Sequence, residues 1–287
     1  EIKEGPFEPT WESLREFVEK HFRIPESRSI DSIEAHSTRD YIEKSWDVFT
    51  RSPDREDPRS SLIPLKNSYV VPGGRFREIY YWDTYFSILG LLASGEKRKA
   101  LDNYRNLLDL VQQFGFIPNG NRKYYLSRSQ PPTLSLTFKA MKENDIEIDR
   151  QFSREMLQKE LDYWKGGNKQ VEVNGNLVYR YYDQDNEPRP ESYREDVETA
   201  EESDNNEIFR HLRSGAESGW DFSSRWTKGE RLDDIRTTEI IPVDLNCMIC
   251  GLETEIDKSS DLNDTINELF WNDEKGFYFD YDMENNH

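Results

Sequence analysis

Residues 72–85 read PGGRFREIYYWDTY and join a glycine turn to the start of a helix. The glycines let the backbone approach a ligand closely, and Arg75 follows them with a planar fork of donors that suits vicinal hydroxyls or a carboxylate. From Tyr80 onward the apolar spacing is helical, so some rings are expected to pack in a core while others line a cavity. The alternative is a structural junction in which Arg75 pairs with Glu78 or Asp83.

Apolar residues recur at three-to-four spacing along most of the chain, which predicts a mainly α fold. Strand signals are few: VEVNGNLVYRYY predicts a hairpin that turns at residues 174–175, and a second hairpin is expected at 276–281. The sequence has no exact repeat, low-complexity tract or linker, so it predicts a single domain over residues 1–287. Helices are expected at residues 11–22, 40–49, 81–92, 98–114, 134–141, 152–164, 192–201, 207–212 and 243–252.

The composition limits the classes of partner. The 287 residues carry a net charge of −19, which opposes binding to nucleic acid or to an anionic membrane surface, because both need a basic face. No apolar run reaches membrane-spanning length. Cys247 and Cys250 lack the further ligands of a zinc site, so both are expected to be small buried residues on a helix. Aromatic residues make up 13% of the chain, as suits a site that stacks on a polar ligand.

A second concentration of reactive groups lies at residues 217–226, ESGWDFSSRW. Glu217 and Asp221 are four residues apart, so a helical turn would place both carboxylates on one face. A carboxylate among the indole rings is partly desolvated, which raises its pKa and favours the protonated form that general acid catalysis needs. Gly219 allows close approach of a substrate. The alternative is that Asp221 caps a helix or pairs with Arg225.

Two long loops, at residues 118–132 and 184–194, carry polar side chains where a simple connector would use Ser and Gly. Such loops in a compact domain are more often functional than connecting. The sequence has no GxSxG, Walker, HExxH or Rossmann motif. The sequence therefore gives no indication of a serine hydrolase, a nucleotide-binding enzyme or a zinc protease of the kinds that carry these motifs.

Taken together, these motifs resemble the trehalase family of glycoside hydrolases. PGGRFREIYYWDTYF, FIPNGNRKYYLSRSQPP, RPESYRED, ESGWDFSSRW and IIPVDLN match the family's signatures in the family's order. The resemblance implies an (α/α)6 toroid of the six-hairpin glycosidase type, with small hairpins in its loops. It also implies hydrolysis of α,α-trehalose to two glucose molecules with inversion, and no metal or other cofactor. Compartment and oligomeric state stay open, because family members occur both inside and outside cells.

The resemblance also assigns roles to individual residues. Asp221 would be the general acid that protonates the glycosidic oxygen, and three arginines would clamp the sugar hydroxyls. The remaining positions would form the walls of a closed pocket. The substrate-binding set is Arg75, Phe76, Tyr80, Trp82, Asp83, Asn119, Arg128, Gln130, Arg189, Glu191 and Gly219.

An inverting mechanism needs a second carboxylate that activates water from the opposite side of the sugar. In the family this general base and a QWD signature lie beyond the motifs present here, so the base is expected outside this chain. The chain is then expected to hold the N-terminal and middle portions of the catalytic domain, with an incomplete toroid. Two alternatives remain: an (α/α)6 hydrolase of another glucoside, and a non-catalytic sugar-binding fragment.

Overall fold

A computed structural model describes residues 10–22, 33–229 and 231–285 of the chain. Contacts group the chain into two compact units, Glu1–Val48 and Phe49–His287. The predicted single domain over residues 1–287 includes residues outside the described ranges and stays a prediction. In the first unit, α1 (Trp11–His21) begins where the Thr10 hydroxyl accepts a hydrogen bond from Ser13 N. Helix α2 (Thr38–Phe49) ends at the boundary between the units.

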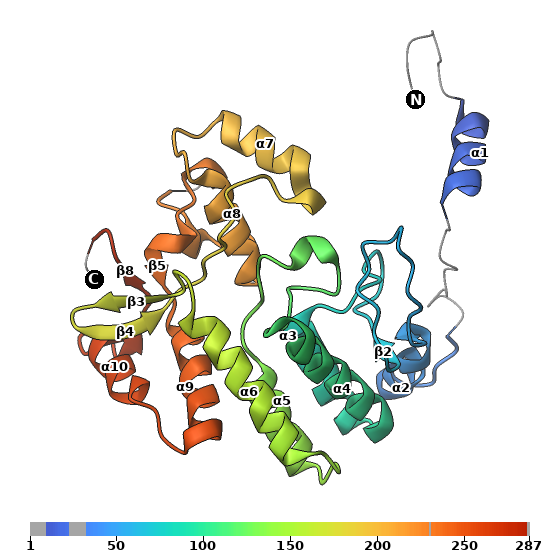
Figure 1. Cartoon of the computed structure of the whole chain (residues 1–287), viewed down its shortest axis with the longest axis horizontal. Coiled ribbons are helices and arrows are strands. Elements are labelled where there is room, and N and C mark those ends of the chain that lie inside the picture. Colours follow the sequence, from blue (N-terminus) through green and yellow to red (C-terminus); the bar gives the residue numbers. More distant parts are fainter. Residues whose placement is uncertain (1–9, 23–32, 230, 286–287) are drawn as a thin grey trace. The chain divides into compact units, whose positions relative to one another are not determined.

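Four helices of the second unit form two contacting pairs. The pairs are α3 (Tyr81–Ala93) with α4 (Lys97–Phe114), and α5 (Leu134–Glu143) with α6 (Arg150–Lys165). Helix α3 also contacts α5, and α4 contacts α6, so the pairs lie side by side as two layers (Figure 1). Buried residues on α4 recur at helical spacing, for example Ala100, Tyr104, Leu107 and Val111. This stripe buries one face of the helix.

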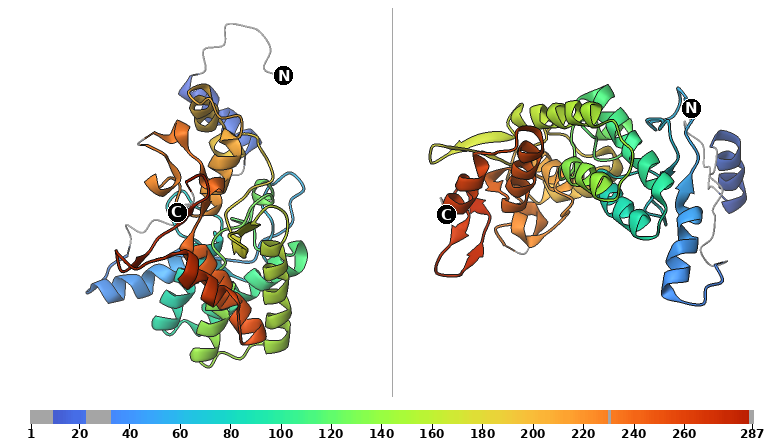
Figure 2. Two further views of the ribbon diagram at one scale, coloured as in Figure 1. Left: turned by 90° about the vertical axis from the view of Figure 1, so that its left-hand side faces the viewer. Right: turned by 90° about the horizontal axis from the view of Figure 1, so that it is seen from below.

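The remaining helices of the second unit make further contacts. Helix α9 (Val243–Asp257) contacts α5 and α6, and α10 (Leu262–Leu269) contacts α9. Helices α7 (Tyr193–Glu201) and α8 (Ile208–Glu217) contact each other. Figure 2 shows the ribbon from two further sides. No helix in the described part of the chain is long and apolar enough to cross a membrane.

Strands form four small antiparallel pairs among the described residues. The predicted hairpin is β3 (Gln170–Val173) with β4 (Asn176–Tyr179), and its turn has positive φ at Asn174 and Gly175. The other pairs join short segments: β1 (Thr50–Arg51) with β2 (Tyr69–Val70), β5 (Ile240–Ile241) with β8 (Tyr281–Asp282), and β6 (Trp271–Asn272) with β7 (Phe277–Tyr278).

The mainly α prediction is confirmed, and three details differ. The second hairpin was expected at 276–281, but β7 pairs with β6, which precedes that range, and β8 pairs with β5. Helix α10 was not predicted, because it is only eight residues long and its apolar pattern is short. The expectation that both cysteines are buried was wrong: Cys247 is exposed and Cys250 is half-buried. Both lie on α9 as expected, but the buried stripe of that helix runs through Leu245, Ile249 and Leu252, and the cysteines lie off it.

Candidate active site

A cavity of about 740 Å³ lies where four segments of the second unit meet. Its lining comes from the 72–83 segment, the 119–130 loop, the start of α7 with the residues before it, and the turn after α8. The structure brings together around this cavity all of the residues to which the family resemblance assigned a role in the site. They are Arg75, Phe76, Tyr80, Trp82, Asp83, Asn119, Arg128, Gln130, Arg189, Glu191, Gly219 and Asp221.

The 119–130 loop is fixed against the start of α3. The first N–H groups of a helix have no partner within the helix and must find one elsewhere. Here Tyr81 N donates to Asn119 O over 3.1 Å, and Trp82 N donates to the Gln130 side chain over 3.1 Å. Asn119 N donates to Arg128 O, which closes the loop on itself. Completing the helix therefore places the loop's polar side chains beside the aromatic residues that open α3.

Two arginines of the cavity are nearly fully buried and held by carboxylates. Arg128 is 1% exposed; it pairs with Glu191 and donates to the Asn119 side chain over 3.2 Å. Its Nη1 atom is buried without a hydrogen-bond partner among the described residues. Arg189 donates to both carboxylate oxygens of Asp196, over 2.6 Å and 3.0 Å. Arg128 thus keeps a donor that a bound ligand can satisfy.

Arg75 is not held in this way. Its guanidinium lies 5.0 Å from the ring centre of Phe76. The alternative pairing with Glu78 was wrong, because Glu78 forms an ion pair with Arg122 from the adjoining loop. The preceding glycines, Gly73 and Gly74, have φ of 100° and 59°, as expected for a turn that only glycine adopts easily.

Asp221 lies in the turn that follows α8. Gly219 has φ of 70°, and a Cβ atom there would lie 2.7 Å from the Trp82 indole, so this turn packs directly on α3. Asp221 opens onto the cavity, while the protein atoms around its other sides raise its pKa by desolvation. The positive charges of Arg189 and Arg128 partly oppose that shift. The predicted direction of the pKa shift is confirmed.

One expectation and one alternative for the ESGWDFSSRW motif were wrong. Glu217 and Asp221 do not share a helical face, because α8 ends at Glu217 and the chain turns at Gly219. Glu217 is fully buried and bonds to Lys169 instead. Arg225 does not pair with Asp221: it pairs with Asp244 and Asp280, which come from later segments.

Asp83 lies close enough to Asp221 for their charges to interact. Burial raises the pKa of Asp83, and the negative charge of Asp221 raises it further. Trp82, next to Asp83, contacts the turn that carries Asp221. The two carboxyl groups therefore belong to adjoining walls of the cavity.

Several residues that line the cavity were not predicted from the sequence. Tyr124 and Tyr125 lie in the same loop as the predicted Asn119 and Arg128, and the density of rings there was the available signal. Pro72, Ser192, Glu195 and Ala216 also line the cavity. Among the described residues, no group of three or more His, Cys, Asp or Glu side chains could hold a metal ion.

Comparisons with known proteins agree with this architecture. Residues 7–287 match the profile of the family described as Trehalase. Among solved structures, the chain is similar to neutral trehalase Nth1 from Saccharomyces cerevisiae, with a TM-score of 0.66 and 21% sequence identity. The match covers 89% of this chain and 56% of the yeast chain, so this chain spans little more than half the length of that structure. The family match extends over nearly the whole sequence, and this chain therefore belongs to the trehalase family.

Proposed function

We propose that the cavity binds α,α-trehalose and forms part of a site for its inverting hydrolysis to two glucose molecules. The observation that carries the proposal is Asp221, a carboxyl group with a raised pKa that opens onto a cavity walled by arginines and aromatic rings. A carboxylic acid with a raised pKa keeps its proton to a higher pH than an ordinary aspartic acid does, and such an acid can donate a proton to a glycosidic oxygen. The unpartnered donor of Arg128 supports a ligand rich in hydroxyl groups.

In the proposed mechanism, Asp221 transfers its proton to the glycosidic oxygen while the bond to the anomeric carbon breaks. Water attacks that carbon from the opposite face and gives up its proton to a general base. The rings of Phe76, Tyr80 and Trp82 cover apolar sugar faces. The hydroxyls are bound by Arg75, Asp83, Asn119, Arg128, Gln130, Arg189 and Glu191, and Gly219 leaves room for the sugar.

The proposal assigns the general base to a carboxylate outside these 287 residues. Glu191 is already paired with Arg128. Asp83 adjoins Asp221, whereas the base must act from the other side of the sugar. On this proposal, residues 1–287 bind trehalose and supply its proton donor, but turn it over very slowly.

We also propose that the two helical layers form part of an (α/α)6 toroid within one catalytic domain. The α3–α5 and α4–α6 contacts support an inner and an outer ring. The cavity residues at the start of α3 and after α8 would then lie at one mouth of the toroid.

Calorimetric titration of the purified chain with trehalose tests the proposal, with maltose and cellobiose as matched disaccharides and glucose release followed over hours. We expect saturable binding of trehalose in preference to the other sugars, with little glucose released. Equal binding of all three would favour a different glucoside specificity, and no binding would reject the site. Robust turnover would show that a base lies within the chain.

A further inference from the structure

Behind the cavity wall, Glu217 and Lys169 form a buried ion pair that the proposed chemistry does not use. Glu217 is 0% exposed and Lys169 is 4% exposed. Lys169 Nζ lies 2.6 Å from both carboxylate oxygens of Glu217 and also donates to Tyr182 O over 2.7 Å. Its ammonium group is 5.1 Å from the ring centres of Tyr163 and Trp164. Both side chains are therefore almost completely shielded from solvent, and the groups that surround them belong to the protein.

The Glu217 carboxylate collects donors from separate segments. Oε1 accepts from Ser129 N over 2.9 Å and from the Tyr163 hydroxyl over 3.1 Å, while Oε2 accepts from Tyr182 N over 3.0 Å. Ser129 stands between Arg128 and Gln130. One carboxylate therefore holds together the backbone of the 119–130 loop, helix α6 and the backbone at Tyr182.

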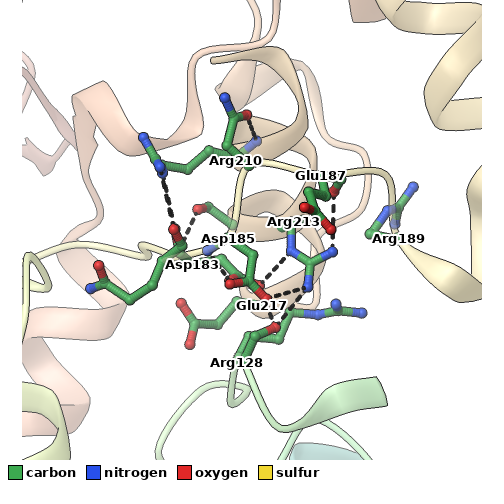
Figure 3. A network of polar contacts seen from close by, with 12 residues as sticks. Arg128, Asp183, Asp185, Glu187, Arg189, Arg210, Arg213 and Glu217 are labelled. Carbon is green, nitrogen blue, oxygen red and sulfur yellow. Dashed lines mark hydrogen bonds and ion pairs between the residues drawn. The ribbon is translucent and has the colours of Figure 1, made fainter.

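Glu217 is also close in sequence to the proposed acid, Asp221. Glu217 is the last residue of α8, and the turn that carries Asp221 begins directly after it. One turn earlier on α8, Arg213 bonds to Asp183 over 3.0 Å and to the Ser127 hydroxyl over 2.9 Å. Figure 3 shows Arg213, Asp183 and Glu217 gathered beside Arg128. Helix α8 is thus bonded to the 119–130 loop at two neighbouring residues, Ser127 and Ser129.

We infer that Glu217 and Lys169 are positioning residues, which set the spacing between the proposed acid Asp221 and the sugar-binding residues Arg128 and Gln130. The inference rests on the proposed function for the meaning of that spacing. A buried ion pair is seldom needed for stability alone, since apolar residues of similar size often do as well. A carboxylate with both oxygens bonded does fix the directions of several backbone groups at once, and apolar residues cannot.

Glu217→Gln tests this role because an amide keeps the size of the side chain and loses one acceptor. Either Ser129 N or Tyr182 N then loses its partner, and Lys169 loses its counter-charge. Because a buried unpaired ammonium can prevent folding, the double variant Lys169→Met with Glu217→Gln removes both charges. Leu252→Ala on α9 is the control: Leu252 is fully buried, and the substitution lowers stability without touching the network.

Two readouts separate positioning from stability: the dissociation constant for trehalose, and hydrogen exchange of residues 127–130 and 218–222. We expect both Glu217 variants to bind trehalose about tenfold more weakly, because small displacements misalign several hydrogen bonds together. Exchange in both segments should become faster. Leu252→Ala, compared at an equal interval below its melting temperature, should match the parent in both readouts.

Parental affinity and exchange in a folded Glu217 variant would overturn the inference, as would equal changes in Leu252→Ala. If the parent chain does not bind trehalose, the proposed function fails, and the exchange measurement alone decides whether the pair positions the two segments.

Discussion

Replacing Glu160 by Gln perturbs a carboxyl group that the proposed mechanism does not use. Glu160 is fully buried on α6, and its Oε1 accepts a hydrogen bond of 2.5 Å from the Tyr81 hydroxyl. Its Oε2 has no hydrogen-bond partner within the described residues. Burial raises the pKa of Glu160 from 4.5 to about 8, and the Tyr81 hydrogen bond opposes that shift. The folded protein therefore keeps Glu160 protonated at neutral pH.

Because the folded pKa lies above the unfolded one, stability falls as pH rises. Below the unfolded pKa of 4.5, Glu160 is protonated in both states. Between the two pKa values the unfolded chain releases a proton that the folded chain retains, so each pH unit lowers the free energy of unfolding by about 1.4 kcal/mol. From about pH 5 to pH 7 the loss is about 3 kcal/mol, and it levels off above about pH 8. Glu160→Gln has no proton to release and escapes this loss.

The assay is urea denaturation of parent and variant, followed by tryptophan fluorescence at a series of pH values across this window. Other titrating groups are present in both proteins and cancel in the difference between their unfolding free energies. Glu155→Gln, which changes an exposed carboxyl on the same helix, is the matched control. A Glu160→Gln difference that stays constant with pH would refute the protonated, buried state.

Three further outcomes are expected. Asp221→Asn should keep trehalose affinity within about twofold and lower the rate of any glucose release by about 10²–10⁴-fold, since only proton donation is lost. Near-parental release would exclude Asp221 as the acid. Arg128→Lys should weaken trehalose binding about tenfold in calorimetry, because lysine lacks the planar guanidinium that can donate to Asn119 and to the sugar at the same time. Parental affinity would make this arginine structural. Gly219→Ala should cost about 1–3 kcal/mol of stability, because it strains a positive φ and drives a methyl group into Trp82; an unchanged melting temperature would contradict that packing.

The residues that line the cavity could be predicted because they cluster in four short motifs. All of the predicted positions line one cavity, even though Arg75, Arg128 and Asp221 come from distant parts of the sequence. The pairings of the charged groups could not be predicted. The alternative reading paired Glu78 with Arg75, three residues away, but Glu78 meets Arg122, which is 44 residues distant. Sequence spacing suggests ion pairs between residues that are close together in the chain, whereas tertiary packing decides which charged side chains come into contact.

The sequence by itself determined the mainly α class and membership of the trehalase family, because helical periodicity and each family motif are written in runs of consecutive residues, and the order of the motifs is read directly along the chain. The tertiary structure alone decided the surroundings of each carboxyl group. Glu217 meets Lys169 across 48 residues, and the turn at Gly219 directs Asp221 away from it toward the cavity. Their different environments depend on which distant segments pack together, since burial and charge at a carboxylate are set by neighbours in space.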